Sequence, residues 1–494
     1  MLIKKDPDII KSYFEDSSNM KGGHALEVVF PKDVDELSAF LKDANSGKLP
    51  VTISGGGTGT TGSRVPFGGA VISMEKFNRI AEISADKMSA SVQTGVSVED
   101  LKNACEEKGL FYTSHPTEKS ATVGGTVATN ASGSRSFKYG PTRRYVRRLK
   151  MVLAGGEVLE IKRGERSLSR DNSLVKLPCG LDIAVPMPSY VMPDVKNAAG
   201  YFVKDGMDLI DLFIGQEGTL SVITDIELGL VPKPADIFSC FVFFEKEEDA
   251  WDFSREARRL SRAKDLSAGP ALDALSIEYF DHNSLDLLRA KGRDLPGDAN
   301  AAIFFEQEIG GKWSGKVEEN WTKLILEHNS SPDETWVAMD DNKQDEFTKL
   351  RHAIPECVNE MIKRNGFQKL SADIAVPDDR FSRMMDFYLS SLMATKLEYV
   401  IFGHIGESHV HVNILPRSET ELRYGTDMLM GFARKGVSLG GTVSAEHGIG
   451  KIKHKYLEVM YGKQGILDMA RIKKAFDPGC ILGLDNIFPK EILR

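Results

Sequence analysis

The chain has 494 residues, of which 41% are hydrophobic and 27% charged, and its formal net charge is −8. This length is too great for a single hydrophobic core, so two or three domains are expected, and the composition is that of an ordinary globular protein. The acidic balance argues against a general nucleic-acid-binding protein, which would normally be basic.

Apolar runs and cysteines restrict the class further. No apolar run reaches the roughly 18 residues that a membrane span needs, and the first ten residues contain no signal-peptide core. The five cysteines form no CxxC pair, which fits a reducing compartment and excludes a cysteine-ligated iron–sulfur cluster within this chain. Their positions are Cys105, Cys179, Cys240, Cys357 and Cys480. The sequence therefore predicts a cytoplasmic protein of enzyme size.

Helices and short strands alternate along the first part of the chain. The segment Val34 to Ala44 is amphipathic, with Asp33 as its cap and Gly47 at its end, and predicts a helix. After Pro234 the amphipathic stretches become longer. Further strands are predicted at 49–53, 70–74, 90–93 and 301–305, and further helices at 98–108, 250–264 and 347–364.

A glycine-rich loop, Ser54 to Gly62, joins two of the predicted strands. Its last six residues match GxGxxG, but a dinucleotide fingerprint of that form must open a helix. Here Pro66 and the pair Gly68-Gly69 follow the loop and break helices. Successive glycine amides can still form an anion-binding nest. The loop is therefore predicted to hold a diphosphate, the alternative being a simple tight turn.

Three segments, taken in order, carry a family resemblance. The glycine loop with Gly69–Asn78, the segment Pro116–Gly133 followed by Gly140, and Leu212–Thr224 resemble the flavin segments of the vanillyl-alcohol-oxidase-type, or PCMH-type, FAD proteins. The resemblance implies bound FAD. Some relatives attach FAD through a histidine in the glycine loop. This loop contains no histidine, so non-covalent FAD is expected.

The cofactor residues implied by this resemblance come from all three segments. Small residues would let the backbone approach the flavin, and the side chains of Thr122, Thr129 and Asn130 offer hydrogen bonds. The full set is Gly55, Gly56, Gly57, Thr58, Gly59, Thr60, Pro116, Thr117, Thr122, Gly125, Thr129, Asn130, Ser132, Gly140, Glu217, Gly218 and Ile223.

The resemblance also implies the fold, an α+β architecture in three parts. Residues 1–234 would form a PCMH-type, two-part FAD-binding domain. Residues 235–421 would form an inserted α/β cap with a ferredoxin-like antiparallel sheet, and residues 422–494 a C-terminal helical segment that completes the active site. The resemblance is weakest at 161–195, which looks like an enlarged loop, and at 483–486.

A second motif, between Phe402 and Asn413, contains three histidines. The turn-like residues 406–408 lie between strand-like residues, so a hairpin would bring His404 and His411 together. Strand alternation puts His409, His411 and Asn413 on one face. The alternative is a group of surface histidines without a shared role.

Further along, Glu446 and His447 stand together before Gly448. Two imidazoles and one carboxylate form a familiar catalytic zinc set with an open position. Both segments resemble those of D-lactate dehydrogenases, glycolate oxidases and D-2-hydroxyglutarate dehydrogenases. That resemblance implies a divalent metal, zinc first and Mn or Fe as alternatives, held by His404, His411 and Glu446, with His447 as the catalytic base.

This chain departs from the family pattern inside the histidine motif. Glu407, Ser408 and His409 stand where aspartate, glycine and asparagine are usual. Both His409 and Asn413 are retained as candidate catalytic-site residues.

Two cations are candidates for binding a substrate carboxylate. The segment around Arg351 resembles a family helix whose arginine grips the carboxylate, and the segment beginning at Lys369 resembles a strand whose lysine joins it. Arg351 can form a bidentate pair, and Lys369 adds a point charge. Pro355 replaces a hydroxyl residue of D-2-hydroxyglutarate dehydrogenases, which counts against that substrate. The alternative is two solvated basic residues.

The function implied is an FAD-dependent dehydrogenase that oxidises a small D-2-hydroxy acid, D-lactate or glycolate first, to the 2-oxo acid. Electrons would pass to an external acceptor: an electron-transfer flavoprotein, a quinone or a cytochrome. We expect a homodimer or a larger protein complex, without nucleic acid. Peripheral contact with a membrane is compatible with this expectation. Two alternatives stay open. One is an enzyme like alkyl-glycerone-phosphate synthase, which uses its flavin without net redox, and the other is a non-catalytic flavoprotein electron-transfer subunit.

A basic run lies between Arg135 and Lys150. It is either a solvated face or a docking patch for an acidic electron-transfer partner or an anionic membrane surface. The run holds no acidic residue and seven cations: Arg135, Lys138, Arg143, Arg144, Arg147, Arg148 and Lys150.

Overall fold

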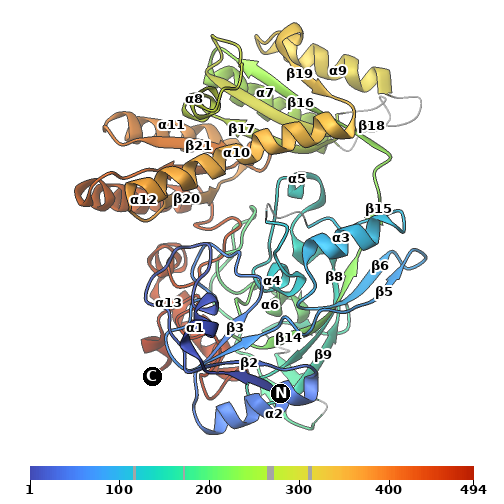
Figure 1. Cartoon of the computed structure of the whole chain (residues 1–494), viewed down its shortest axis with the longest axis vertical. Coiled ribbons are helices and arrows are strands. Elements are labelled where there is room, and N and C mark those ends of the chain that lie inside the picture. Colours follow the sequence, from blue (N-terminus) through green and yellow to red (C-terminus); the bar gives the residue numbers. More distant parts are fainter. Residues whose placement is uncertain (115–117, 171–172, 178, 264–271, 310–313) are drawn as a thin grey trace.

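The computed structural model describes residues 1–114, 118–170, 173–177, 179–263, 272–309 and 314–494. A lower unit, built from the first 234 residues together with the end of the chain, carries an upper unit formed by the central part (Figure 1). We call the upper unit the cap. Its single sheet and the two main sheets of the lower unit account for most of the strands.

A four-stranded sheet begins the lower unit, in the order β1-β2-β4-β3. Strands β2, β4 and β3 are parallel, and β1 is antiparallel to β2. The glycine loop connects β3 to β4, and no helix follows it. This agrees with the prediction that the loop is not a dinucleotide-binding fingerprint. The strands are β1 (Leu2–Lys4), β2 (Glu27–Phe30), β3 (Val51–Ser54) and β4 (Ala70–Ser73), and helices α1 (Pro7–Ile10) and α2 (Val34–Ser46) accompany them.

Helix α2 has the predicted ends. The side chain of Asp33 accepts a hydrogen bond from the backbone N–H of Glu36, and Gly47 follows the last turn. Its apolar face, Leu37 and Leu41, packs in a core shared with the four-stranded sheet.

A five-stranded antiparallel sheet, in the order β5-β6-β14-β8-β9, completes the core of the lower unit. Helix α3 begins at its predicted cap Ser97, whose hydroxyl accepts from Asp100 N. The strands are β5 (Ile80–Ser84), β6 (Ser89–Gln93), β8 (Val146–Val152), β9 (Val158–Lys162) and β14 (Val222–Gly229). The helices are α3 (Val98–Glu106), α4 (Val123–Ala128), α5 (Ser136–Tyr139) and α6 (Ile210–Phe213).

The expected enlarged loop at 161–195 contains short strands where it is described. They are β10 (Ser167–Leu168), which pairs with β13 (Met207–Asp208), and the two-stranded pair of β11 (Leu174–Lys176) and β12 (Asp182–Ala184). Two further short strands, β7 (Leu110–Phe111) and β15 (Val231–Pro232), pair with each other where the chain leaves for the cap.

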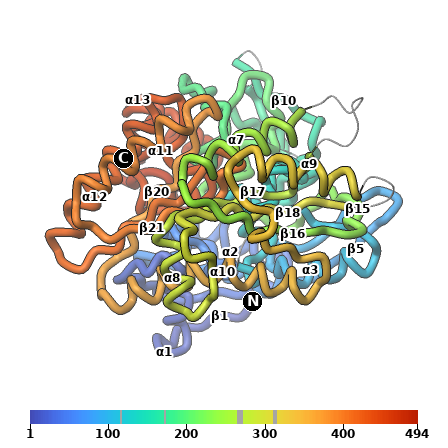
Figure 2. Tube along the Cα trace, turned by 90° about the horizontal axis from the view of Figure 1, so that it is seen from above, coloured from blue at the N-terminus to red at the C-terminus, as the bar shows by residue number. Residues whose placement is uncertain are grey.

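The cap is built on a seven-stranded antiparallel sheet in the order β19-β16-β18-β17-β21-β22-β20. Seen from above, the sheet extends across the cap from β16 and β18 through β17 to β21 (Figure 2). Its strands are β16 (Asp236–Phe244), β17 (Ala274–Phe280), β18 (Ala301–Ile309), β19 (Trp336–Ala338), β20 (Leu370–Ala375), β21 (Tyr399–Gly403) and β22 (His409–Ile414). Its helices are α7 (Glu247–Arg262), α8 (His282–Ala290), α9 (Ser314–Glu327), α10 (Asp341–Asn365), α11 (Phe381–Met393) and α12 (Glu419–Ser438).

Helices cover both faces of this sheet. Strand alternation sends Val242 into a core with helices α7, α9, α11 and α12, and its neighbours Phe241 and Phe243 into a second core with α8 and α10. Helix α12 packs on the cap through Phe432, so the boundary expected after Glu421 falls inside a cap helix.

The end of the chain returns to the lower unit (Figure 1). Helix α13 (His454–Phe476) places Phe476 edge-on against Phe213, with ring centroids 5.1 Å apart. Beyond it, Leu482 forms a parallel bridge with Val51 of β3. Among the described residues, no helix is long and apolar enough to cross a membrane.

Most cations of the basic run at 135–150 have partners within the protein, and its role as a docking patch stays a prediction. Arg135 pairs with Glu306 of β18 at 2.8 Å, and Lys138 with Asp273 at 2.8 Å and Glu308 at 3.2 Å, so α5 is bound to the cap by charges. Four of the other five cations bind within the lower unit. Their partners are Asp211 for Arg143, Glu160 and Glu227 for Arg148, and the carbonyls of Tyr139 and Lys87 for Arg144 and Arg147.

Candidate active site

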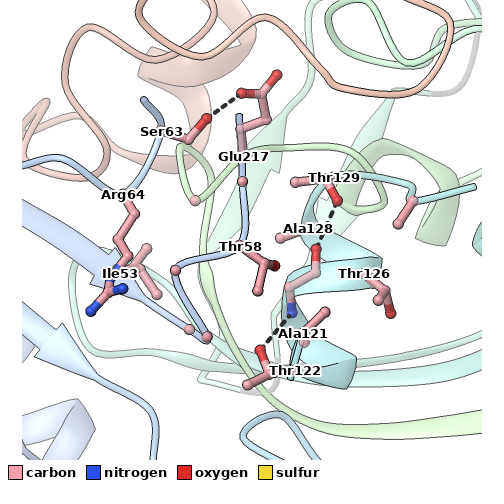
Figure 3. A pocket seen from close by; sticks show the side chains of 18 of the residues that line it. Ile53, Thr58, Ser63, Arg64, Ala121, Thr122, Thr126, Ala128, Thr129 and Glu217 are labelled. Carbon is pink, nitrogen blue, oxygen red and sulfur yellow. Dashed lines mark hydrogen bonds between the residues drawn. The ribbon is translucent and has the colours of Figure 1, made fainter. Parts of the chain in front are cut away.

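A single cavity brings the glycine loop and the C-terminal histidine segment together. The glycine loop, the N-terminus of α4, the turn at Glu217-Gly218, and Glu446 with His447 all line it. Figure 3 shows the loop that carries Thr58 beside the helix that carries Thr122 and Thr129. The walls therefore come from four separated parts of the chain.

Thirteen of the seventeen expected cofactor residues line this cavity. Asn130 and Gly140 do not. The Asn130 side chain is buried and accepts a hydrogen bond from the backbone N–H of Arg143 at 3.0 Å, and Gly140 ends α5. Pro116 and Thr117 lie outside the described residues. Binding of FAD by each lining residue stays a prediction.

Glycine is required in the loop where two walls approach each other closely. A Cβ atom on Gly55 would lie 2.7 Å from Thr122 Oγ1, and one on Gly56 would lie 2.6 Å from the Ser120 carbonyl oxygen. At Gly59 no atom lies within 4 Å of the Cβ position, so the loop presents open space to the cavity. These features fit the close backbone approach that a diphosphate needs.

Two threonine hydroxyls are already used by the backbone of α4. Thr122 Oγ1 accepts from Gly125 N at 3.2 Å as the helix cap, and Thr129 Oγ1 donates to the Gly125 carbonyl at 2.9 Å. The Thr122 hydroxyl can still donate and the Thr129 hydroxyl can still accept, so their hydrogen bonds to the cofactor stay a prediction.

Glu217 joins the cavity turn to the C-terminal segment. Its buried carboxylate accepts from Ser63 Oγ at 2.8 Å, from Ile449 N at 2.8 Å and from Gly450 N at 2.7 Å. Burial raises the pKa of Glu217, and these three donors oppose that rise. The residue thereby fixes the segment that follows His447 against the glycine loop.

The predicted histidine hairpin is confirmed. Strands β21 and β22 pair antiparallel, and the rings of His404 and His411 lie 5.4 Å apart. Glu446 Oε2 lies 3.1 Å from His404 Nε2 and 3.7 Å from His411 Nε2. All three side chains are largely buried. Converging imidazole nitrogens and a carboxylate oxygen suit a divalent metal.

The pKa of His404 is shifted in the opposite direction from those of His409 and His411. Burial opposes a charge on His404, but the carboxylates of Glu278 and Glu446 outweigh it and raise the pKa of His404 to about 9. Burial instead lowers the pKa of both His409 and His411. Neutral imidazoles are the form that binds a metal.

Arg351 lies at the edge of this cluster, as expected, and Lys369 does not. Arg351 Nε and Nη2 donate to Glu278 Oε2 at 3.1 and 2.9 Å, and His404 Nδ1 lies 2.6 Å from Glu278 Oε1. Lys369, just before β20, exposes much of its surface, yet burial of its ammonium group lowers its pKa to about 8, and it has no ion pair among the described residues. Asn413 is buried on β22, with Nδ2 3.4 Å from the His411 carbonyl.

The sequence did not single out Asp373, which lies on β20 with no solvent exposure of its side chain. Its Oδ2 atom lies 3.2 Å from His447 Nδ1 and accepts from Lys453 Nζ and Ser444 Oγ, each at 2.8 Å. Oδ1 lies 3.0 Å from His409 Nε2. A lone carboxylate inside an apolar strand was the available signal, because such a residue needs partners when buried.

Lys196 was also missed. Its Nζ atom lies 2.5 Å from Glu446 Oε1 and 2.5 Å from Glu407 Oε2, and the side chain is 4% exposed. Burial opposes its charge, but the two carboxylates raise the pKa of Lys196. No local pattern marks it, because its partners follow more than 200 residues later.

Comparison with protein families agrees with this geometry. Residues 25–162 match a family described as an FAD binding domain, and residues 234–484 match the C-terminal domain of FAD linked oxidases. The chain belongs to the FAD-linked oxidases. The FAD-linked oxidases are FAD-dependent oxidoreductases, so the expected enzyme class and the expected flavin are confirmed.

Two characterised relatives extend along most of the chain. The glycolate oxidase subunit GlcD of Bacillus subtilis is 29% identical over 482 residues, covering 94% of this chain and 89% of the relative. A D-lactate dehydrogenase of Archaeoglobus fulgidus is 29% identical over 470 residues, covering 94% of this chain and 91% of the relative.

Solved structures share the fold. The 4-ethylphenol oxidase of Gulosibacter chungangensis has a TM-score of 0.70 at 17% identity, over 100% of this chain and 95% of its own. An alkyldihydroxyacetonephosphate synthase has a TM-score of 0.66 at 13% identity, over 97% and 82%. The predicted α+β, PCMH-type architecture is confirmed, and at these identities the similarity concerns the fold alone.

Proposed function

We propose that this FAD-linked oxidase is a dehydrogenase of a small 2-hydroxy acid, with D-lactate and glycolate as the first candidates. One observation carries the proposal: the cavity lined by the glycine loop is also lined by Glu446 and His447, beside the buried histidine cluster. A hydroxy acid between them would meet a base and the flavin site together. The names of the two relatives support this class of substrate.

The donor sets fit the two groups that the proposal requires. The glycine loop and the N-terminus of α4 would hold FAD, and His404, His411 and Glu446 would hold a divalent metal, zinc first. When bound, the flavin would accept the substrate's α-hydrogen as hydride at N5, and the metal would lower the pKa of the substrate hydroxyl.

His447 has the position of a general base. Nδ1 faces the buried carboxylate of Asp373 at 3.2 Å, so Nε2 is the nitrogen left to take a proton. The ring stacks on His411, with centroids 5.1 Å apart, and is partly exposed next to the cavity. We assign to it the removal of the hydroxyl proton.

We assign to Arg351 the binding of the substrate carboxylate. Its Nε and Nη2 atoms are used by Glu278, while Nη1 has no hydrogen bond among the described residues. An arginine already held on one side by a carboxylate is pre-oriented for a second one. Lys369 is a weaker candidate, because no ion pair links it to a residue of the cluster among the described residues.

Electrons must leave the reduced flavin. Since the chain has no CxxC pair for a cluster of its own, we propose an external acceptor: an electron-transfer flavoprotein, a quinone or a cytochrome.

Anaerobic titration of the flavin with paired D- and L-2-hydroxy acids, with and without a chelator, tests the proposal. We expect bleaching of the flavin absorbance by one enantiomer, lost after chelation. An unbleached flavin with every acid would contradict the dehydrogenase and would favour an enzyme without net redox, like the synthase that shares the fold, or a non-catalytic electron-transfer subunit.

A further inference from the structure

His409 stands where the family usually has asparagine, and the structure places it inside the histidine cluster. It begins β22, its side chain has no solvent exposure, and its ring centroid lies 5.4 Å from that of His404 and 4.7 Å from that of His411. The imidazole of His409 therefore lies inside the histidine cluster and not at its edge.

The ring of His409 is short of hydrogen bonds. Nε2 lies 3.0 Å from Asp373 Oδ1, yet neither ring nitrogen makes a hydrogen bond of good geometry with any described residue. Lys453, Ser444 and the backbone N–H of His447 all donate to Asp373 Oδ2, and Oδ1, which faces His409, also accepts from the backbone N–H of Glu446 at 3.3 Å. Burying an imidazole without well-formed hydrogen bonds costs free energy of folding, unless another group binds its lone pair.

Ligand atoms of His409 converge with those of its neighbours. One ligand atom each from His404, His409 and Glu446 lie within 4.8 Å of one another, and the same holds for Asp373, His409 and His411. Ligands at about 2.0–2.2 Å from a tetrahedral zinc ion lie roughly 3.3–3.6 Å apart, so these side chains have to move closer together by up to roughly 1.5 Å when the ion binds.

We infer that His409 is an additional metal ligand, so that three imidazoles and one carboxylate hold the ion: His404, His409, His411 and Glu446. The inference rests on the metal centre of the proposed function. An additional imidazole in place of an amide favours Zn²⁺, Co²⁺ or Ni²⁺ over Mn²⁺, which prefers oxygen ligands. Four protein ligands complete a tetrahedral set, so a substrate must enter as a fifth ligand.

Metal binding, rather than turnover, tests the inference. Metal-free holoflavoprotein is reloaded with Zn²⁺, Mn²⁺ or Co²⁺, and dissociation constants are measured by chelator competition in wild type, His409→Asn and the remote control His328→Gln. We expect His409→Asn to weaken Zn²⁺ binding by about tenfold or more while Mn²⁺ binding changes less. The visible Co²⁺ bands should lose intensity, and the control should match wild type.

X-ray absorption of the wild-type zinc protein gives a second measurement that needs no variant to fold. Three imidazoles per zinc support the inference, and two overturn it. Unchanged Zn²⁺ affinity and Co²⁺ bands in His409→Asn also overturn it, leaving His409 as a structural partner of Asp373. Failure of the wild type to bind one metal per chain overturns both this inference and the metal centre of the proposed function.

Discussion

Asp373 and His447 form a buried carboxylate–imidazole pair, with Oδ2 3.2 Å from Nδ1. They come from the cap strand β20 and from the loop before α13, so the pair spans two parts of the molecule. A carboxylate in this position fixes the tautomer and orientation of the imidazole. It makes Asp373 a positioning residue for the proposed base.

His447→Ala is expected to bind substrate and yet reduce the flavin about a hundredfold more slowly or worse, because a general base is lost. Asp373→Asn should slow the same step while substrate affinity changes little, since it disturbs orientation only. Stopped-flow flavin reduction at several substrate concentrations separates the rate from the affinity. Wild-type reduction rates in His447→Ala would remove this residue from the reaction.

Metal removal should abolish turnover and leave FAD bound, because the histidine cluster and the glycine loop use different residues. His404→Ala and His411→Ala should have the same effect as chelation. With metal at saturating concentration, His409→Asn should keep most turnover, since it restores the residue usual in the family. Activity, metal content and flavin absorbance are measured on the same samples. Full activity in the chelated enzyme would require another role for these histidines.

Arg351→Ala should chiefly weaken substrate binding, by about 2–5 kcal/mol if the substrate carboxylate loses its buried partner. It also leaves Glu278 without one of its two cations, since Arg351 and His404 hold the pKa of Glu278 at about 2 against the effect of burial. The double variant Arg351→Ala with Glu278→Gln is the matched control. If the double variant regains substrate affinity, the arginine acts through Glu278 and not through the substrate.

Lys196→Met should destabilise the fold by about 3–5 kcal/mol, because it leaves two buried carboxylates, Glu407 and Glu446, without their shared cation. Adding Glu407→Gln should recover part of this loss. Chemical unfolding followed by fluorescence measures both. Equal stability of Lys196→Met and wild type would show that the ion pairs are not formed in solution.

FAD should be released by acid or heat, because the glycine loop contains no histidine to which it could be attached. The measurement is flavin absorbance in the supernatant after precipitation of the protein. Flavin retained in the denatured pellet would reveal a covalent bond, and a colourless protein after reconstitution with FAD would contradict the flavin site.

Local patterns predicted the parts of the site that are close in sequence. The hairpin follows from the six residues between His404 and His411, and Pro66 with Gly68-Gly69 after the glycine loop excluded a helix there. Lys196 and Asp373 carry no such pattern. Each acquires its role from carboxylates or imidazoles that lie at least 36 residues away along the chain.

The partners of the basic run could not be predicted for the same reason. Its charge is evident in the sequence, but Glu306 and Asp273, which neutralise Arg135 and Lys138, belong to another unit and lie more than 130 residues further on. Counting charges within a window cannot reveal this pairing. The sequence could not establish the domain boundary near Glu421 either, because the amphipathic face of α12 does not indicate which sheet the helix covers.

The bridge between Val51 and Leu482 has a consequence for biosynthesis. Strand β3 leads directly into the glycine loop, and Asn486 donates to the carbonyls of Ser63 and Glu217 on either side of the cavity. The first half of the cavity is therefore incomplete during synthesis until some 430 later residues have been made, and over that span the edge of β3 lacks its partner Leu482. In a chain arrested before Leu482 one wall of the cavity is missing, so FAD should not bind to it. We therefore expect FAD binding to be the last step of folding.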